Sequence, residues 1–141
     1  IFLVRALQEA KLTEKDVKLV LLQHADGRTA LERGDVDAWA GLDPLMAAAE
    51  VESGASLFYR NAAANTWGVL NVSEAFAKDN PALVTKVLKA YEQARAFSLA
   101  NPAELKKSLI AYTKLPDAVI QRQLERTELP HSAIGQPQVD T

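Results

Sequence analysis

An α/β domain followed by a run of helices is the fold that the sequence predicts. Over the first sixty residues, segments with apolar side chains at helical spacing alternate with short apolar segments that contain β-branched residues. Such alternation is typical of helices packed on a mostly parallel sheet. Beyond residue 73 the pattern is helical, and at 61–65 the sequence becomes small and unpatterned. This stretch is therefore the expected domain boundary.

Three helices and three strands are expected in the first sixty residues. The apolar run at 17–22 suits a strand buried on both faces of a parallel sheet. Gly34 follows the second helical pattern as a helix stop, and Asp43-Pro44 places an N-cap residue and a first-turn proline at the start of the third helix. The expected order is helix 2–11, strand 17–22, helix 25–33, strand 35–40, a helix from Asp43-Pro44 to Val51, and strand 56–60.

The rest of the sequence predicts one extended segment at 67–72, three helices, and a loop at 129–141. A proline marks the start of each helix, at Pro81, Pro102 and Pro116, and an asparagine precedes the first two prolines. The apolar residues expected to face inward are Leu83, Val84, Val87, Leu88, Tyr91, Ala94 and Phe97 in the first helix, Leu105, Leu109 and Tyr112 in the second, and Val119, Ile120 and Leu124 in the third.

Charge and composition exclude several classes of protein. The chain has 16 Lys and Arg residues against 18 Asp and Glu residues, so it has no surplus of positive charge for binding nucleic acid. It has no cysteine, which removes disulfides, zinc–thiolate sites and thiol nucleophiles. No apolar run approaches the roughly 20 residues of a membrane-spanning helix. Because the chain begins at Ile1 in a helical pattern, we expect it to be a piece of a longer protein.

Catalytic chemistry finds little support in the residues. The two histidines are His24 and His131, and the second lies in the expected terminal loop without an acidic or nucleophilic neighbour in a motif. His24 follows the expected buried strand and precedes Asp26, at a strand end where ligands often bind. A solvated or capping histidine is the more common case. No G-x-S-x-G, P-loop or G-x-G-x-x-G motif is present, and we predict no catalytic residue and no cofactor.

Three aspartates and one helix start remain as candidates for binding chemistry. Asp35, Asp37 and Asp43 offer oxygen ligands, but their spacing does not match an EF-hand loop, and we predict no metal site. The helix start at Asp43-Pro44 would present unpaired N–H groups and the positive end of the helix dipole to an anion. The alternative is that it is an ordinary capped helix without a ligand. Core packing is likewise the alternative to ligand contact for the aromatic residues near strand ends, which are Trp39, Tyr59 and Trp67.

The segment from Leu31 to Pro44 resembles a known family, the periplasmic substrate-binding proteins of ABC importers for aliphatic sulfonates, which are close to those for taurine and nitrate. The family has a helix ending in the pattern ERGDVDAW, a short strand, and an aromatic-Asp-Pro turn that starts a helix; Leu42 stands here where many members carry an aromatic residue. The resemblance continues at Ala75 to Pro81 and at Gln121 to Thr127.

The resemblance implies a two-lobed, type II periplasmic-binding-protein-like α/β fold, of which this chain would be the C-terminal half. Residues 1–60 would form most of the second lobe, 61–65 the hinge crossing, and 66–141 the return segment and the helices that pack on the first lobe. A signal peptide would precede the chain, and the protein would be exported to the periplasm. A missing segment, a second copy or a swapped partner is expected to cover its exposed apolar faces.

The function that the resemblance implies is capture of a small sulfonate or similar oxyanion for delivery to an ABC permease, without enzymatic chemistry. The second lobe would contribute mainly backbone groups, while the Asp43 carboxylate turns inward and caps its own helix. His24 and Asp26 could line the rim. The ligand-binding residues expected on this basis are Gly41, Leu42, Asp43 and Pro44, followed by Trp39, Asn65 and Trp67.

Two other functions share this fold and remain open at this point. One is a biosynthetic protein similar to the pyrimidine-precursor proteins of thiamine synthesis, which use histidine and cysteine chemistry. The other is the effector-sensing domain of a transcriptional regulator, which would carry a helix-turn-helix upstream of these residues.

Overall fold

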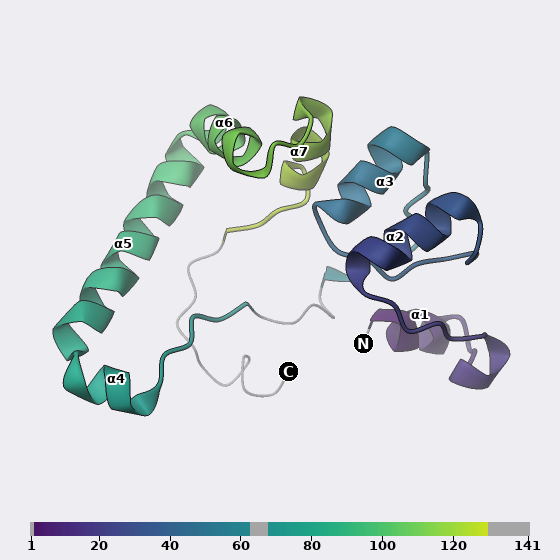
Figure 1. The fold of residues 1–141 in the computed structure, drawn as a ribbon, viewed down its shortest axis with the longest axis horizontal. Coiled ribbons are helices and arrows are strands. Elements are labelled where there is room, and N and C mark those ends of the chain that lie inside the picture. Colours follow the sequence, from purple (N-terminus) through teal and green to yellow (C-terminus); the bar gives the residue numbers. More distant parts are fainter. Residues whose placement is uncertain (1, 63–67, 130–141) are drawn as a thin grey trace. The chain divides into compact units, whose positions relative to one another are not determined.

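The computed structural model describes residues 2–62 and 68–129. The chain divides into two compact units. The first unit comprises residues 1–65 and 115–126, and the second comprises 66–114 and 127–141. Figure 1 shows the elements in chain order. Residues 115–126, which contain the last described helix, therefore belong to the first unit, although residues 66–114 of the second unit precede them in the sequence.

Four α-helices and one 3-10 helix form the described part of the first unit. The predicted helices at 2–11, 25–33 and 43–51 are confirmed with small shifts of their ends, and so is the helix that follows Pro116. Gly34 and Gly54 end the second and third helices with φ of 77° and 70°, a left-handed conformation that glycine adopts without steric cost. The bounds are α1 Phe2–Glu9, η1 Glu14–Asp16, α2 His24–Arg33, α3 Leu45–Ser53 and α7 Asp117–Leu124.

The strands expected in this unit are not observed. The structure assigns no strand anywhere in residues 2–62 and 68–129, so the α/β prediction is not confirmed there. The expected burial of 17–22 is wrong for this structure, since Leu21 is 94% exposed. A strand needs neighbouring strands to pair its N–H and C=O groups. The segments 17–22, 35–40 and 56–60 instead run as non-helical connections between helices.

The core of the first unit lies where α3 meets α7. Ala47 and Ala48 of α3 and Val119 of α7 are fully or almost fully buried against one another, and Leu115 packs beside them. Short side chains on α3 let the two helix backbones approach closely. Because α2 and α7 both pack against it, α3 is the central helix of the described part of this unit.

Hydrogen bonds and ion pairs connect α2 to α3. The Arg28 guanidinium lies 2.6 Å from Glu32 and 2.7 Å from Glu52. The Ser53 hydroxyl donates to Glu32 over 2.6 Å. Donation by Ser53 and Arg28 lowers the pKa of Glu32 below its ordinary value of 4.5, because both bonds favour the charged carboxylate.

This contact predicts that the free energy of unfolding decreases at acidic pH. A carboxyl group with a lowered folded pKa contributes stability that is present above the unfolded pKa and is lost as the pH falls through the folded value. Glu32→Gln should therefore lower the free energy of unfolding at pH 7 and reduce its dependence on pH below about 4.5. Urea unfolding at a series of pH values measures this. Glu14→Gln, which removes a carboxylate outside the α2–α3 contact, is the control; equal effects of the two variants would contradict the prediction.

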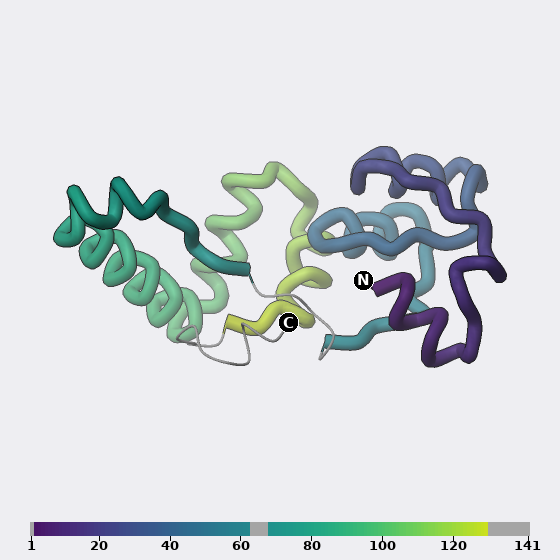
Figure 2. Tube along the Cα trace, turned by 90° about the horizontal axis from the view of Figure 1, so that it is seen from below, coloured from purple at the N-terminus to yellow at the C-terminus, as the bar shows by residue number. Residues whose placement is uncertain are grey.

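The second unit is helical over most of its described length. Its helices are α4 Glu74–Asp79, α5 Pro81–Ala100 and α6 Pro102–Thr113, which confirms the two helices predicted to start at Pro81 and Pro102. The Ser73 hydroxyl accepts the Phe76 N–H over 3.2 Å and caps α4. In Figures 1 and 2, α4 lies at one end of the long α5 and α6 at the other. The predicted extended segment 67–72 is described from residue 68 onwards, where it is non-helical.

The apolar stripe of α5 is not buried as predicted. Arg95 pairs with Glu92 and donates to the Leu129 carbonyl over 3.0 Å, which fixes residue 129 beside α5. A helix buries its apolar stripe only against another apolar surface, and α4 and α6 contact α5 near its ends. Among the described residues, no helix combines the length and the apolar character that crossing a membrane requires. The predicted inward residues that are exposed are Leu83, Val87, Leu88, Tyr91, Ala94, Phe97 and, on α6, Tyr112.

Candidate ligand-binding site

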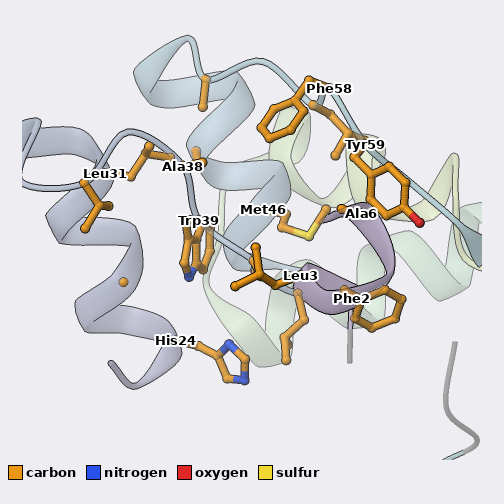
Figure 3. Close-up of a pocket in the computed structure, with 18 of the residues that line it drawn as sticks. Phe2, Leu3, Ala6, His24, Leu31, Ala38, Trp39, Met46, Phe58 and Tyr59 are labelled. Atoms are coloured by element: carbon orange, nitrogen blue, oxygen red, sulfur yellow. The ribbon is translucent and has the colours of Figure 1, made fainter. Parts of the chain in front are cut away.

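An open cavity of about 1260 Å³ lies within the first unit. It is formed by α1, α2 and α3, by the three non-helical segments that the sequence predicted as strands, and by Arg126 after α7. This volume exceeds the range of about 300–1,000 Å³ that is usual for small-molecule sites. Figure 3 shows its apolar lining, which includes Phe2, Leu3, Ala6, Leu31, Trp39, Met46 and Phe58.

Trp39 forms one wall of the cavity, and its indole ring is held between two glycines. An ideal Cβ on Gly27 of α2 would lie 2.5 Å from the indole Nε1. An ideal Cβ on Gly41 would lie 2.5 Å from Cη2 at the other end of the ring. The absence of a side chain at both positions thus creates the space that the ring occupies.

The Asp43 carboxylate caps α3, as the sequence predicted. Its Oδ1 accepts the Ala47 N–H over 3.0 Å. The helix itself begins one residue later than expected, because Pro44 is the N-cap residue and Leu45 the first helical residue. A negative side chain beside the helix N-terminus is favourable because it faces the positive end of the helix dipole.

Arg126, which is not among the site residues predicted from the sequence, joins this helix start to the end of α7. Its Nε and Nη2 donate to the two carboxylate oxygens of Asp43 over 2.7 and 2.8 Å. Its Nη1 lies 2.7 Å from Glu50 Oε2, an oxygen without solvent contact. The hydrogen bonds to Asp43, together with the close ion pair with Glu50, raise the pKa of Arg126 above its already high ordinary value. The guanidinium therefore remains charged and holds two carboxylates in place.

The pairing of Arg126 follows from no local sequence pattern. The residue lies 83 positions from Asp43, so neither helical spacing nor a capping motif connects the two. Its position in the segment Gln121 to Thr127, which carries part of the family resemblance, was the one available signal. The Arg60 side chain also reaches this place and donates to the Arg126 carbonyl over 3.4 Å.

The electrostatics of the described lining do not favour an anion at the start of α3. The Met46 N–H already donates to the Leu42 carbonyl over 3.1 Å, and the Ala47 N–H donates to Asp43. An anion there would compete with a carboxylate that Arg126 already neutralises. Acidic side chains outnumber basic ones around the cavity. The acidic lining residues are Asp16, Asp26, Asp35, Asp37, Asp43 and Glu50, and the basic ones are Lys18, Arg60 and Arg126.

The structure brings several of the predicted site residues to one cavity. Trp39, Gly41, Leu42 and Asp43 all line it, and so do His24 and Asp26 of α2. Pro44 stands next to them at the N-cap of α3 but is not among the lining residues. The predicted residues Asn65 and Trp67 lie outside the described part of the chain. Within that part, no three His, Asp or Glu side chains are grouped so that they could hold a metal ion.

Comparisons with known proteins agree with the resemblance seen in the sequence. Residues 1–105 match the family model described as "NMT1/THI5 like". The chain is 33% identical over 125 residues to a protein of Escherichia coli (strain K12), and 26% identical over 115 residues to one of Bacillus subtilis (strain 168). Both relatives are named "Putative aliphatic sulfonates-binding protein".

The matched regions cover most of this chain but a minority of each relative. They span 87% and 80% of the chain, and 39% and 35% of the Escherichia coli and Bacillus subtilis proteins. No solved structure matches the chain significantly. Because the family model covers well over half of its residues, the chain belongs to the NMT1/THI5-like family.

Proposed function

We propose that the chain is part of a solute-binding protein that captures an aliphatic sulfonate, or a similar small oxyanion, and delivers it to an ABC permease. The observation that carries this proposal is the 33% identity, over 87% of the chain, to a protein named for binding aliphatic sulfonates. The cavity in the first unit supports it, because an open, largely apolar surface suits the alkyl part of such a ligand.

The described cavity is suited to one half of the ligand. Trp39, Leu3 and Met46 offer apolar surface, and each buried methylene of an alkyl chain contributes about 0.8 kcal/mol. The sulfonate group carries a permanent negative charge and needs hydrogen-bond donors in exchange for its water. The acidic side chains that predominate around this cavity do not supply them. In this proposal the backbone N–H groups of Gly41, Leu42 and Asp43, which precede the helix start, contribute some donors, and most come from residues beyond this chain.

The relatives are much longer than this chain, and we therefore place the chain in one part of a two-lobed protein. The chain spans about two fifths of their length. We place most of a second lobe at residues 1–60, a hinge at 61–65, and the return to a first lobe at 66–141. The ligand would be enclosed between the two lobes, and the protein would be exported to the periplasm, where it meets its permease. Binding and release then suffice for function, and no nucleophile or cofactor is needed.

A thermal-shift panel tests the proposal. The full-length protein that carries these residues is heated with alkanesulfonates, taurine, nitrate and sulfate in turn. A ligand that binds only the folded state stabilises it by about 2.7 kcal/mol at one hundred times its dissociation constant. We expect alkanesulfonates to raise the Tm, with sulfate, which lacks the alkyl part, having little effect. A Tm unchanged by every compound would remove the sulfonate assignment.

A further inference from the structure

We propose that Gly27 and Gly41 are positioning residues that hold the Trp39 indole as a fixed wall of the cavity and thereby set the length of alkyl chain that the cavity accepts. This inference rests on the proposed function for its ligand. Its structural part, the placement of the ring by the two glycines, stands on the contacts in the first unit alone.

The conformation of the backbone does not explain the glycine at position 27. Gly34 and Gly54 have positive φ and open space around them, so their lack of a side chain serves the helix ends. Gly27 lies inside α2, and its N–H donates to the Gln23 carbonyl over 2.8 Å, as in any regular helix. Glycine is disfavoured relative to alanine at such a position. The space that it opens for the Trp39 ring is the reason that the structure offers.

The two glycines contact opposite ends of one rigid ring. A Cβ at position 27 would meet the pyrrole side of the indole, at Nε1 and Cδ1, within 2.5 and 2.7 Å. A Cβ at position 41 would meet the benzene side, at Cη2, Cζ2 and Cζ3, within 2.5 to 2.7 Å. An aromatic ring cannot bend away from such a contact, so the whole side chain would have to move. Together the glycines therefore define where the ring lies.

The position of the ring matters for the cavity because Trp39 is part of its lining. Figure 3 shows Trp39 beside α2 with Leu3 and Met46 among the neighbouring lining residues. A ring displaced by a new methyl group would change the apolar surface that these residues form. An alkyl chain loses roughly a factor of four in affinity for each methylene that it can no longer bury. The loss should therefore grow with the length of the chain.

A double-mutant cycle tests the placement of the ring without any ligand. In the full-length protein, Gly27→Ala should lower the Tm, because the methyl group collides with the indole. In a Trp39→Leu background the same change should raise the Tm, because the collision is gone and alanine favours the helix. Gly68→Ala is the matched control, since nothing lies within 4 Å of a Cβ at that position. A higher Tm for Gly27→Ala in both backgrounds would overturn the placement.

A fluorescence measurement covers the case in which the Trp39→Leu protein does not fold. The two tryptophans of these 141 residues are Trp39 and Trp67, so a full-length protein in which Trp67 and every tryptophan outside these residues are replaced by phenylalanine reports on Trp39. Gly41→Ala in that protein should shift the emission of Trp39, because the ring leaves its place between the glycines. An unchanged emission spectrum would contradict the inference.

The ligand part is tested by titrating methane-, butane- and hexanesulfonate into the wild-type and Gly41→Ala proteins. We expect less than about a threefold loss of affinity for methanesulfonate and at least about a tenfold loss for hexanesulfonate. Equal losses for all three would overturn the role in chain length. If the wild-type protein binds none of them, the proposed function fails, while the double-mutant cycle still decides whether the glycines place the ring.

Discussion

Replacing Arg126 with alanine should lower the free energy of unfolding by about 2–4 kcal/mol. Removing one partner of a buried ion pair leaves the other charge without compensation, at a cost of about 3–5 kcal/mol when burial is complete. The side chains of Arg126, Asp43 and Glu50 are 12%, 22% and 18% exposed, so some solvent reaches the two carboxylates and the expected loss is smaller. Urea unfolding at pH 7 measures the change.

Arg122→Ala is the matched control for this prediction. Arg122 also pairs with a carboxylate, Glu125, but both side chains are 50% exposed and their closest atoms are 3.5 Å apart. Exposed pairs of this kind contribute about 0–1 kcal/mol. Arg126→Lys should lie between the two variants, because an ammonium group keeps the charge but cannot bind both Asp43 oxygens in the same bidentate geometry. An Arg126→Ala protein as stable as the Arg122→Ala protein would contradict the role assigned to this network.

Val119→Ala is expected to cost about 2–3 kcal/mol. Val119 is completely buried against Ala47 and Ala48 of α3. Its two lost methyl groups account for about 1.6 kcal/mol of transfer free energy. The cavity that they leave adds to this, because neighbours with short side chains cannot move in to fill it. The same urea unfolding experiment gives the result.

Val51→Ala makes the same chemical change at a solvent-facing position of α3. Val51 is 41% exposed, and alanine has the higher helix propensity, so the variant should be neutral or slightly more stable. A difference of at least about 1.5 kcal/mol between the two variants supports the α3–α7 core. Equal stabilities would show that α7 does not pack on α3 in solution.

The helices could be predicted from the sequence because their signals are local. Gly34 after the last periodic residue of α2, and the Asn-Pro pairs before α5 and α6, act within one turn of the helix they delimit. Such signals do not depend on what the rest of the protein supplies. In the described part of the chain, the starts of α5, α6 and α7 and both ends of α2 were therefore predicted to within one residue, and the ends of α1 and α3 to within two.

The strands and the burial could not be predicted in the same way because both depend on partners distant in the sequence. The apolar run at 17–22 has the composition of a buried strand, yet in this structure it is exposed and unpaired with any strand of the described range. The periodic spacing of apolar residues indicates which face of a helix or strand would be buried, but not whether another surface is present to cover that face. The stripe of α5, with Leu88 and Tyr91 more than half exposed, shows the same limit.

Part of the cavity lining could be predicted from the sequence, while ligand binding by these residues stays a prediction. One cavity is lined by Trp39, Gly41, Leu42 and Asp43. These residues belong to a short segment whose turn and helix start can be predicted from the sequence. Arg126 was missed because its pairing with Asp43 is a tertiary contact. Gly27 was missed because a glycine that makes room for a distant ring looks, in the sequence, like any other helical glycine.

The most direct test of the proposed function is a calorimetric titration of butanesulfonate into two proteins, the 141-residue chain and the full-length protein that carries it. In the proposed function the apolar wall of the site lies in this chain, and most donors for the sulfonate group lie beyond it. We therefore expect one-to-one binding by the full-length protein and weak or undetectable binding by the chain alone. Tight one-to-one binding by the 141 residues, or no binding by the full-length protein, would contradict this expectation.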